Sequence, residues 1–439
     1  MGLVDVAVLG RVGARELAAA GLGNAIFFAI SIIGMGVMFG IDPMISQAIG
    51  AGDRVRARRI LWQGIWLGLI VTGVLTIVLV AGALAIPYAG FAEELVAPAT
   101  AYLLVRTISL APFLLFFVVR SYLQAHGVTR PMVTAMIAAN VLNLGGDILF
   151  IFGGGILPDW TGPLRSIPAL GVAGAALATV FCTILELAIV AMAVRNVAPG
   201  FSRANGGLKP AATFDHRPNR AEIGRAFRVG LPVGLQMGAE VGVFALVALL
   251  AGRLGTLDLA AHQLVIGLAS FTYTAAMGVA AAGSVRVGIG VGARNPEATR
   301  IAGHAAFVGG VGLMGIAALA FTFAPRALAR LITDEANVIA AAIPLFLVAA
   351  VFQLSDGVQG VGGGVLRGAG DTKFSLYANL AGHWLIGLPI ALYLGFRAGL
   401  GIVGLWWGLC VGLTVVAILL FTRFERLSSK TIEPLDVSS

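Results

Sequence analysis

The chain alternates long apolar runs with short polar connections. Residues 60–92, 301–325 and 398–422 contain no Asp, Glu, Lys or Arg, and each run exceeds the roughly 20 residues that a helix needs to cross a bilayer. Backbone groups in lipid must be hydrogen-bonded within the protein, which leaves helices or a closed barrel. These runs lack the strict polar–apolar alternation of barrel strands. The pattern therefore predicts an all-α polytopic membrane protein.

The same pattern sets the number of spans. It predicts about twelve transmembrane helices, the first of them partial. We place them at residues 1–10, 20–49, 60–87, 97–123, 131–153, 169–194, 226–251, 259–290, 302–323, 338–365, 374–396 and 400–422.

Composition narrows the function classes. Hydrophobic residues make up 59% of the 439 positions and charged residues only 11%, which leaves no soluble domain large enough for an enzyme. The sequence has no phosphate-binding GxxxxGK[ST], no HExxH and no CxxC motif. The net charge of +8 is dispersed over the predicted loops instead of forming a nucleic-acid patch. We therefore expect a non-enzyme with no cofactor and no nucleic-acid partner.

Lys and Arg predict the orientation. One set of alternate loops, together with the C-terminal tail, carries 21 of them, and the other set carries seven. The positive-inside rule places the richer set in the cytoplasm. We expect an inner-membrane protein with a lobe at 1–195, a cytoplasmic linker at 196–224, a second lobe at 225–423 and a cytoplasmic tail at 424–439.

An internal repeat relates the two halves. Matching residues lie 242 or 243 positions apart: 35–37 with 277–279, Gly50 with Gly292, Arg58 with Arg300, and Gly127 with Gly370. Both halves have the same predicted orientation. The repeat therefore predicts two pseudo-symmetric six-helix lobes, an arrangement typical of transporters whose site lies near mid-membrane.

The repeat also bears on the first helix. Gly10 and Arg11 match Gly252 and Arg253, at the end of a helix that begins near Arg225. We therefore expect the first helix to be truncated, with about 18 residues missing relative to a spanning helix. An upstream in-frame apolar extension would support this expectation, and a mapped N-terminus at Met1 would contradict it.

Two acids lie deep inside predicted spans. Glu240 and Asp356 are each flanked by long uncharged segments. A carboxylate at that depth is protonated, binds a cation or faces a wet cavity. Gln236 shares a helix face with Glu240, and Gln353 lies one turn before Asp356. A purely structural interpretation, an acid kept protonated and hydrogen-bonded for packing, stays open beside the functional one.

A polar stripe occupies the predicted fifth helix. Asn140, Asn143 and Asp147 follow i, i+3, i+7 spacing and so share one face. The stripe predicts either an ion-coupling site or hydrogen bonds between helices. Glu186 is a weaker candidate, because it has no charged or amide side chain three or four residues away and Cys182 lies one turn before it.

Five motifs together resemble the multidrug and toxic compound extrusion (MATE) family over nearly the whole chain. They are MGLVDVAVLGRVGARELAAAGLGN, GMGVMFGIDPMISQAIGAGD, NVLNLGGDILFIFG, GLPVGLQMGAEVGVFALVALLAGRLGT and LSDGVQGVGGGVLRGAGDTK. The resemblance implies twelve helices in two lobes. It also implies export of organic cations and drugs in exchange for sodium ions or protons.

The resemblance assigns roles to individual residues. Asp5, Asn143 and Asp147 resemble the ion-coupling residues of the family's amino-terminal lobe. Glu240 and Asp356 resemble the carboxylates of the carboxy-terminal lobe, with Na⁺ a possible ligand there. Phe352 departs from the Tyr of sodium-coupled relatives, so the coupling ion stays open between H⁺ and Na⁺. The expected substrate-cavity residues are Gln236, Gln353, Phe352 and Asn140.

These observations predict an antiporter that works as a monomer in the bilayer and exports small organic cations. The first alternative is a flippase of lipid-linked oligosaccharides, which would need a basic cavity, whereas the candidate residues here are acidic. The second alternative is a channel or another non-transporting membrane protein. A channel usually carries a pore ring or filter, and we find no repeated filter sequence.

Overall fold

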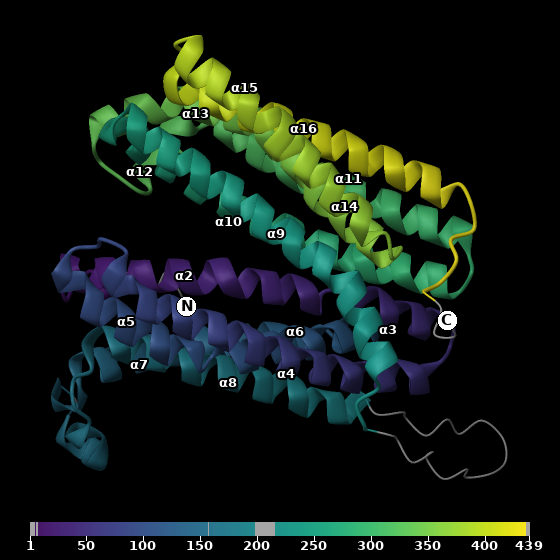
Figure 1. Ribbon diagram of the computed structural model, residues 1–439, viewed down its shortest axis with the longest axis horizontal. Helices are drawn as coiled ribbons and strands as arrows, with labels where there is room; N and C mark the ends of the chain where they lie inside the picture. The colour runs from purple at the N-terminus through teal and green to yellow at the C-terminus, as the bar shows by residue number, and fades with distance from the viewer. Residues whose placement is uncertain (1–4, 6–7, 157, 198–215, 436–439) are drawn as a thin grey trace. The chain divides into compact units, whose positions relative to one another are not determined.

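The computed structural model describes residues 5, 8–156, 158–197 and 216–435. These residues form helices joined by short turns and contain no β-strand (Figure 1). Eleven helical segments among them are long and apolar enough to cross a membrane. These coincide with the eleven full-length spans expected from hydropathy, which confirms the all-α membrane prediction. The partial span at 1–10 lies largely outside the described residues.

The chain packs as two compact units. The first unit comprises residues 1–41 and 58–227, and the second comprises 42–57 and 228–439. The predicted linker includes residues 198–215, which lie outside the described part. Residues 42–57 pack with the second unit although they precede most of the first in sequence.

The first unit is a bundle in which α2 packs on α5 and α6, and α8 packs on α5, α6 and α7. Its helices are α2 (Ala14–Met38), α4 (Arg54–Ala85), α5 (Glu93–Thr107), α6 (Leu110–Ala125), α7 (Arg130–Phe152) and α8 (Gly171–Val197), with short 3₁₀ turns η1 (Ile86–Tyr88), η2 (Gly154–Ile156) and η3 (Asp159–Ser166).

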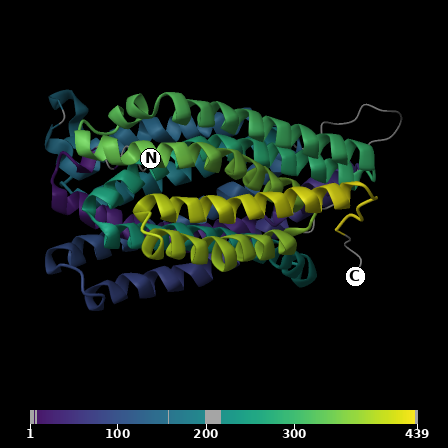
Figure 2. The ribbon, with the colours of Figure 1, turned by 90° about the horizontal axis from the view of Figure 1, so that it is seen from above.

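The second unit centres on α13, which contacts α10, α11 and α16. Its elements are α3 (Ile41–Gly50), α9 (Arg220–Leu254), α10 (Thr256–Gly292), α11 (Pro296–Phe323), α12 (Pro325–Arg330), α13 (Ala336–Gly368), α14 (Thr372–Asn379), the π-helix η4 (Leu380–Gly387), α15 (Leu388–Leu392), the π-helix η5 (Tyr393–Arg397) and α16 (Gly401–Ser428). Figure 2 shows the segment from α14 to η5 running beside α16.

Helix boundaries repeat with the sequence. The α2–α3 span and α10 begin at Ala14 and Thr256, and α4 and α11 begin at Arg54 and Pro296, both 242 positions apart. The α5–α6 span and α13 begin 243 positions apart. The turns that follow use Gly127 and Gly370 with φ of 74° and 88°, a left-handed conformation that glycine adopts without steric cost. The repeat therefore extends to where the helices begin and to the glycine turns.

The halves differ in helix continuity. The first-half spans are interrupted, between α2 and α3 at residues 39–40 and between α5 and α6 at residues 108–109, whereas α10 and α13 are continuous. The first interruption lies where the chain passes from one unit to the other.

Glycines let α3 dock closely on α10 within the second unit. A methyl group on Gly50 would lie 2.0 Å from the Ile289 carbonyl oxygen, and one on Gly292 would lie 2.0 Å from the Gln47 carbonyl oxygen. Both pairs are related by the 242-residue repeat, so the contact is reciprocal. Only glycine permits this backbone approach.

Polar contacts fix α3 further. Asp42 forms a buried ion pair with Arg367 of α13 at 3.4 Å. Gln47 donates from Nε2 to the Gly368 carbonyl at 3.0 Å and accepts from the Leu435 backbone N–H at 2.7 Å. A buried charge is tolerated when it is paired in this way. The contacts thus hold α3 and the chain's last described residue in one unit.

The outer faces of both units are apolar. Ile77, Val308 and Phe323 expose 71%, 74% and 81% of their surface. Large exposed apolar areas of this kind mark contact with a membrane or a partner, and a bilayer satisfies them along whole helices.

Candidate functional site

The first unit gathers a buried carboxyl cluster. Asn143 donates from Nδ2 to Asp5 Oδ1 at 2.9 Å and to Asp147 Oδ1 at 3.5 Å. Thr179 of α8 donates to Asp5 Oδ2 at 3.3 Å. Asn143 and Asp147 are fully buried, and Asp5 is 7% exposed. One amide thus bridges two acids that are 142 residues apart in sequence.

Helix geometry explains which stripe residues take part. Asn143 and Asp147 lie one turn apart on α7, where the Asn143 amide reaches the Asp147 carboxyl group. Asn140 is exposed, and its amide donates to the Met136 carbonyl of its own helix at 2.7 Å. The structure therefore separates Asn140 from the rest of the predicted stripe.

Glu240 of α9 anchors a second cluster. Its Oε2 accepts hydrogen bonds from Gln359 Nε2 of α13 at 3.2 Å and from Asn379 Nδ2 of α14 at 3.3 Å. Asn379 ends α14 just before the π-helix η4, and Trp384 of η4 donates to the Ala239 carbonyl at 3.1 Å. Local π-helical turns recur at functional sites, and this one positions Asn379 against α9.

Asp356 belongs to the same cluster but is bare. It is 6% exposed, and its charge interacts with that of Glu240. Among the described residues we find no hydrogen bond or ion pair to its carboxyl group. Removing one partner from a buried charge costs several kcal/mol, roughly 3–5, so an isolated carboxylate here requires a proton or a cation.

Amide oxygens around the second cluster are also unpaired. Oε1 of Gln359, Oδ1 of Asn379 and Oε1 of Gln353 are buried and have no hydrogen-bond partner in the described part of the chain. Carboxylate and amide oxygens are ligands that hard cations favour. Glu240 and Asp356 together with these oxygens therefore fit a small monovalent cation such as Na⁺. No group of three or more His, Cys, Asp and Glu residues with metal-site geometry occurs among the described residues.

The other predicted cavity residues each lie one helical turn before Glu240 or Asp356. Gln353 is fully buried and donates to Thr272 Oγ1 at 2.5 Å. Gln236 is 8% exposed and faces Gly363. Phe352 is 2% exposed and packs on Phe244 with ring centroids 6.1 Å apart. Phe352 therefore contributes packing and no oxygen.

Sequence reasoning missed two participants. Thr179 and Asn379 lie in predicted spans but had no acidic neighbour three or four residues away, and they reach their partners only through tertiary packing. A polar residue in an otherwise apolar span was the one available signal.

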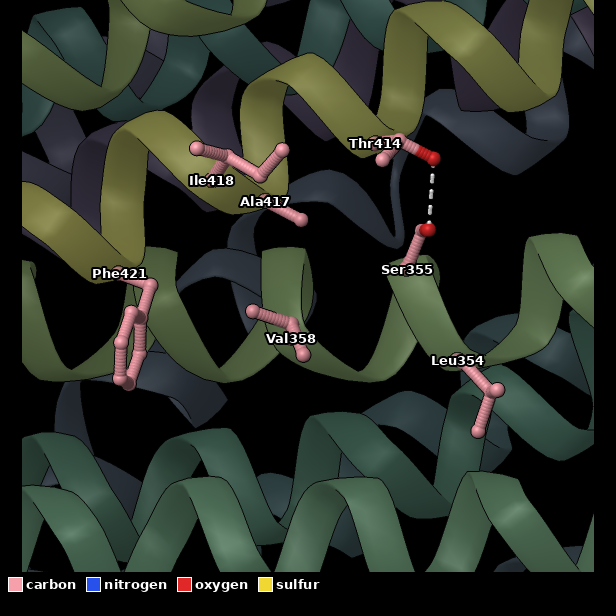
Figure 3. Close-up of a pocket in the computed structure, with 7 residues that line it drawn as sticks. All are labelled: Leu354, Ser355, Val358, Thr414, Ala417, Ile418 and Phe421. Atoms are coloured by element: carbon pink, nitrogen blue, oxygen red, sulfur yellow. Dashed lines mark hydrogen bonds between the residues drawn. The ribbon is translucent and has the colours of Figure 1, made fainter.

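A separate groove of about 380 Å³ lies between α13 and α16 (Figure 3). Apolar side chains line it, and the Ser355 and Thr414 hydroxyls form a hydrogen bond of 2.8 Å at one end. Ser355 and Val358 point toward α16, whereas Gln353 and Gln359 of the same helix bond to α10 and α9. The groove therefore lies on the face of α13 away from the carboxyl cluster.

The chain as a whole is similar to known proteins. The MatE family model matches residues 1–149 and 232–393. A probable multidrug resistance protein NorM of Rhizobium meliloti is 33% identical over 96% of this chain and 88% of its own length. A probable multidrug resistance protein NorM of Deinococcus radiodurans is 35% identical over 97% of this chain and 90% of its own.

A solved structure agrees in fold. A MOP-superfamily transporter from Pyrococcus furiosus, described as having a binding pocket of reverse polarity, superimposes with a TM-score of 0.82 at 24% identity. The match covers 98% of this chain and 91% of that one. This match shows the fold, and the family model together with the two NorM relatives shows that this chain belongs to the MatE family of membrane transporters and is not an enzyme.

Proposed function

We propose that this protein is a secondary active antiporter that exports organic cations and drugs across the cytoplasmic membrane in exchange for H⁺ or Na⁺. Family membership and the multidrug resistance names of the two NorM relatives support export of drugs. Acids inside both units support cationic substrates and ion coupling.

The proposal rests on the buried carboxyl group of Asp356, which has no hydrogen-bond or ion-pair partner among the described residues. A buried acid with no protein partner changes its energy sharply when it gains or loses a proton or a cation. Such a group favours one conformation when it is loaded and another when it is empty. Coupling requires this difference in ion affinity between two states.

The second cluster supplies the main ion-coupling residues in this scheme. Glu240 and Asp356 bind the ion, and the amides of Gln359 and Asn379 hold Glu240 in place. Asp5, Asn143 and Asp147 form the ion-coupling cluster of the first unit. Binding of the ion from outside favours release of substrate on the outer side of the membrane. Departure of the ion into the cytoplasm lets the substrate site open toward the cytoplasm again.

The orientation and the assembly state are part of the proposal. The excess of basic residues on one set of loops supports a cytoplasmic linker and C-terminus. Each unit holds a complete cluster within one chain, which supports function as a monomer.

The test is efflux of ethidium from membrane vesicles with imposed Na⁺ and H⁺ gradients, each applied alone. We expect uphill export driven by one gradient and lost in Glu240→Gln and Asp356→Asn. Asp334→Asn, an exposed acid in a loop, is the matched control and should export normally. Normal ion-driven export by the Glu240→Gln/Asp356→Asn double variant would contradict the assignment.

The same assay separates the alternatives. A channel gives only downhill flux. A flippase of lipid-linked oligosaccharides gives no ethidium export with either gradient, and lipid-linked substrates would then be tested. The Pyrococcus furiosus neighbour shows that this fold accommodates more than one pocket polarity, so the charge of the transported molecule must be measured directly.

A further inference from the structure

A segment without regular secondary structure follows α16, the last helix of the second unit. It comprises Thr431–Leu435, and Ser429 and Lys430 separate it from the helix. Its Ile432 packs against an apolar cluster of buried residues from α10, α11, α13, α14 and α16. Terminal segments are usually poorly ordered unless specific contacts hold them. The partners of this segment therefore deserve an explanation.

Leu435 is bound through both of its backbone groups. Its N–H donates to Gln47 Oε1 at 2.7 Å, and its carbonyl oxygen accepts from Arg56 Nη2 at 3.1 Å. Gln47 lies on α3 and Arg56 in the first turn of α4, and both belong to the second unit. The nitrogen of the same Gln47 amide donates to the Gly368 carbonyl of α13 at 3.0 Å. One buried side chain thus connects the terminal segment, α3 and α13.

The Leu435 side chain lies on the turn that follows α13. A methyl group on Gly370 would lie 3.1 Å from Leu435 Cγ and Cδ2, so the glycine leaves room for the leucine. Proteins often recognise extended peptides by combining main-chain hydrogen bonds with a place for a side chain. Gln47, Arg56 and the Gly370 turn supply both kinds of contact. They therefore form a surface suited to one residue of an extended peptide.

The two polar side chains of this surface are not repeated in the other half of the sequence. At the offset of 242 residues, Ile289 stands at the position of Gln47. At the same offset, Ala298 stands at the position of Arg56. Neither apolar side chain can form such hydrogen bonds, although the helices themselves repeat. Helix packing in this fold consequently does not require the polar pair.

The helix that carries Gln47 receives little support from the chain on either side of it. Residues 1–41 before α3 and residues 58–227 after it belong to the first unit, and only 42–57 belong to the second. The helix is also interrupted at residues 39–40, just before α3. Contacts between segments far apart in sequence must therefore keep α3 in the second unit. The terminal segment supplies some of these contacts.

We propose that Gln47, Arg56 and the Gly370 turn form a docking site for the chain's own segment Thr431–Leu435, and that the docked segment is a strap that fastens α3 to the second unit. The short connection to α16 keeps the effective concentration of the segment in roughly the millimolar range, so a few contacts suffice for docking. The strap goes beyond the proposed transport function and does not depend on which ion or substrate is carried.

The experiment measures amide hydrogen exchange of α3 by mass spectrometry, with the purified full chain in lipid nanodiscs. Leu435→Pro removes the N–H that Gln47 accepts, and Arg56→Met removes the donor to the Leu435 carbonyl. Since exchange reports local opening, each loss should accelerate exchange in α3 about fivefold, as expected for one hydrogen bond. A chain that ends at Lys430 loses both hydrogen bonds and the leucine contact, so exchange should accelerate at least about tenfold.

Glu433→Ala changes an exposed residue of the same segment and is the matched control, in which α3 should exchange at the parent rate. Parent-like exchange in the chain that ends at Lys430 would overturn the strap, because α3 would then be held by its helix contacts alone. Equal acceleration in Glu433→Ala and Leu435→Pro would overturn docking through Leu435. If Arg56→Met does not fold, the two changes in the terminal segment decide.

Discussion

The first unit joins its two acids through one shared amide, whereas the second unit gives Glu240 two amide donors and leaves Asp356 without a hydrogen bond or ion pair among the described residues. Both clusters are buried and both combine carboxyl groups with asparagine. They differ in how the carboxyl groups are held. Both acids of the first cluster accept hydrogen bonds from protein side chains, whereas Asp356 in the second must gain a proton or a cation.

The two clusters differ in their charged residues although the backbone of the two halves repeats closely. At the offset of 242, Asp5 matches Val247, and at 243 Asp356 matches Phe113. Helix starts and turn glycines recur, while the charged positions do not. The two halves therefore share their helix framework and differ in their buried charged residues. Substitutions in the two clusters should accordingly have different effects.

The largest effect is expected at the bare acid. Asp356→Asn removes the group that must gain a proton or a cation, so ion-driven efflux should fall at least about tenfold, corresponding to ~1.4 kcal/mol or more of lost coupling. The initial rate of ethidium efflux measures it. The adjacent Ser355→Ala faces the groove instead of the cluster and should retain the parent rate. Equal losses in both variants would attribute the effect to α13 packing.

Substitutions at Gly50 and at Gly292 should lower stability to a similar extent. Gly50→Ala and Gly292→Ala each force a methyl group against a carbonyl oxygen, which should cost about 1–3 kcal/mol of stability. Gly278→Ala, with nothing within 4 Å of the added carbon, is the control. Melting temperatures in detergent should drop for the first two variants only. A drop in just one of the pair would contradict the reciprocal contact.

A smaller effect on ion affinity is expected at Asn379, which donates a hydrogen bond to Glu240. Asn379→Ala removes one of its two amide donors and a free amide oxygen, a loss of about 1 kcal/mol, or about fivefold in ion affinity. With Na⁺ coupling, the half-maximal Na⁺ concentration should rise. With H⁺ coupling, the pH of half-maximal efflux should move to the alkaline side, because the ionised form loses a donor. An unchanged response to both ions would remove Asn379 from the site.

The smallest effect is expected at Asn140. Its amide bonds to its own helix and its side chain is exposed, so Asn140→Ala should change stability by no more than about 0.5 kcal/mol. Efflux of ethidium should be unaltered. Loss of efflux would return Asn140 to the substrate cavity predicted from its spacing.

Hydropathy was sufficient for the spans, because a bilayer imposes one length and one composition on every crossing helix. Helical spacing correctly paired Asn143 with Asp147, but it could not show that Asn140 is exposed while they are buried, because the burial of a polar face depends on which helices pack there. Asp5 was recognised through family resemblance, since its short visible run carries little signal. The roles of Thr179 and Asn379 depend on contacts between distant segments, which spacing along one helix does not encode.

The placement of α3 has a consequence for biosynthesis. The second unit is not encoded by one continuous stretch, because it includes a segment from the first tenth or so of the chain. That segment leaves the ribosome long before α10 and α13 exist, with Asp42 and Gln47 still lacking their partners in the second unit. Contacts of such long sequence separation form late and slowly. Completion of the second unit must therefore wait for nearly the whole chain, and a nascent protein stalled before α13 would lack the Arg367 partner of Asp42.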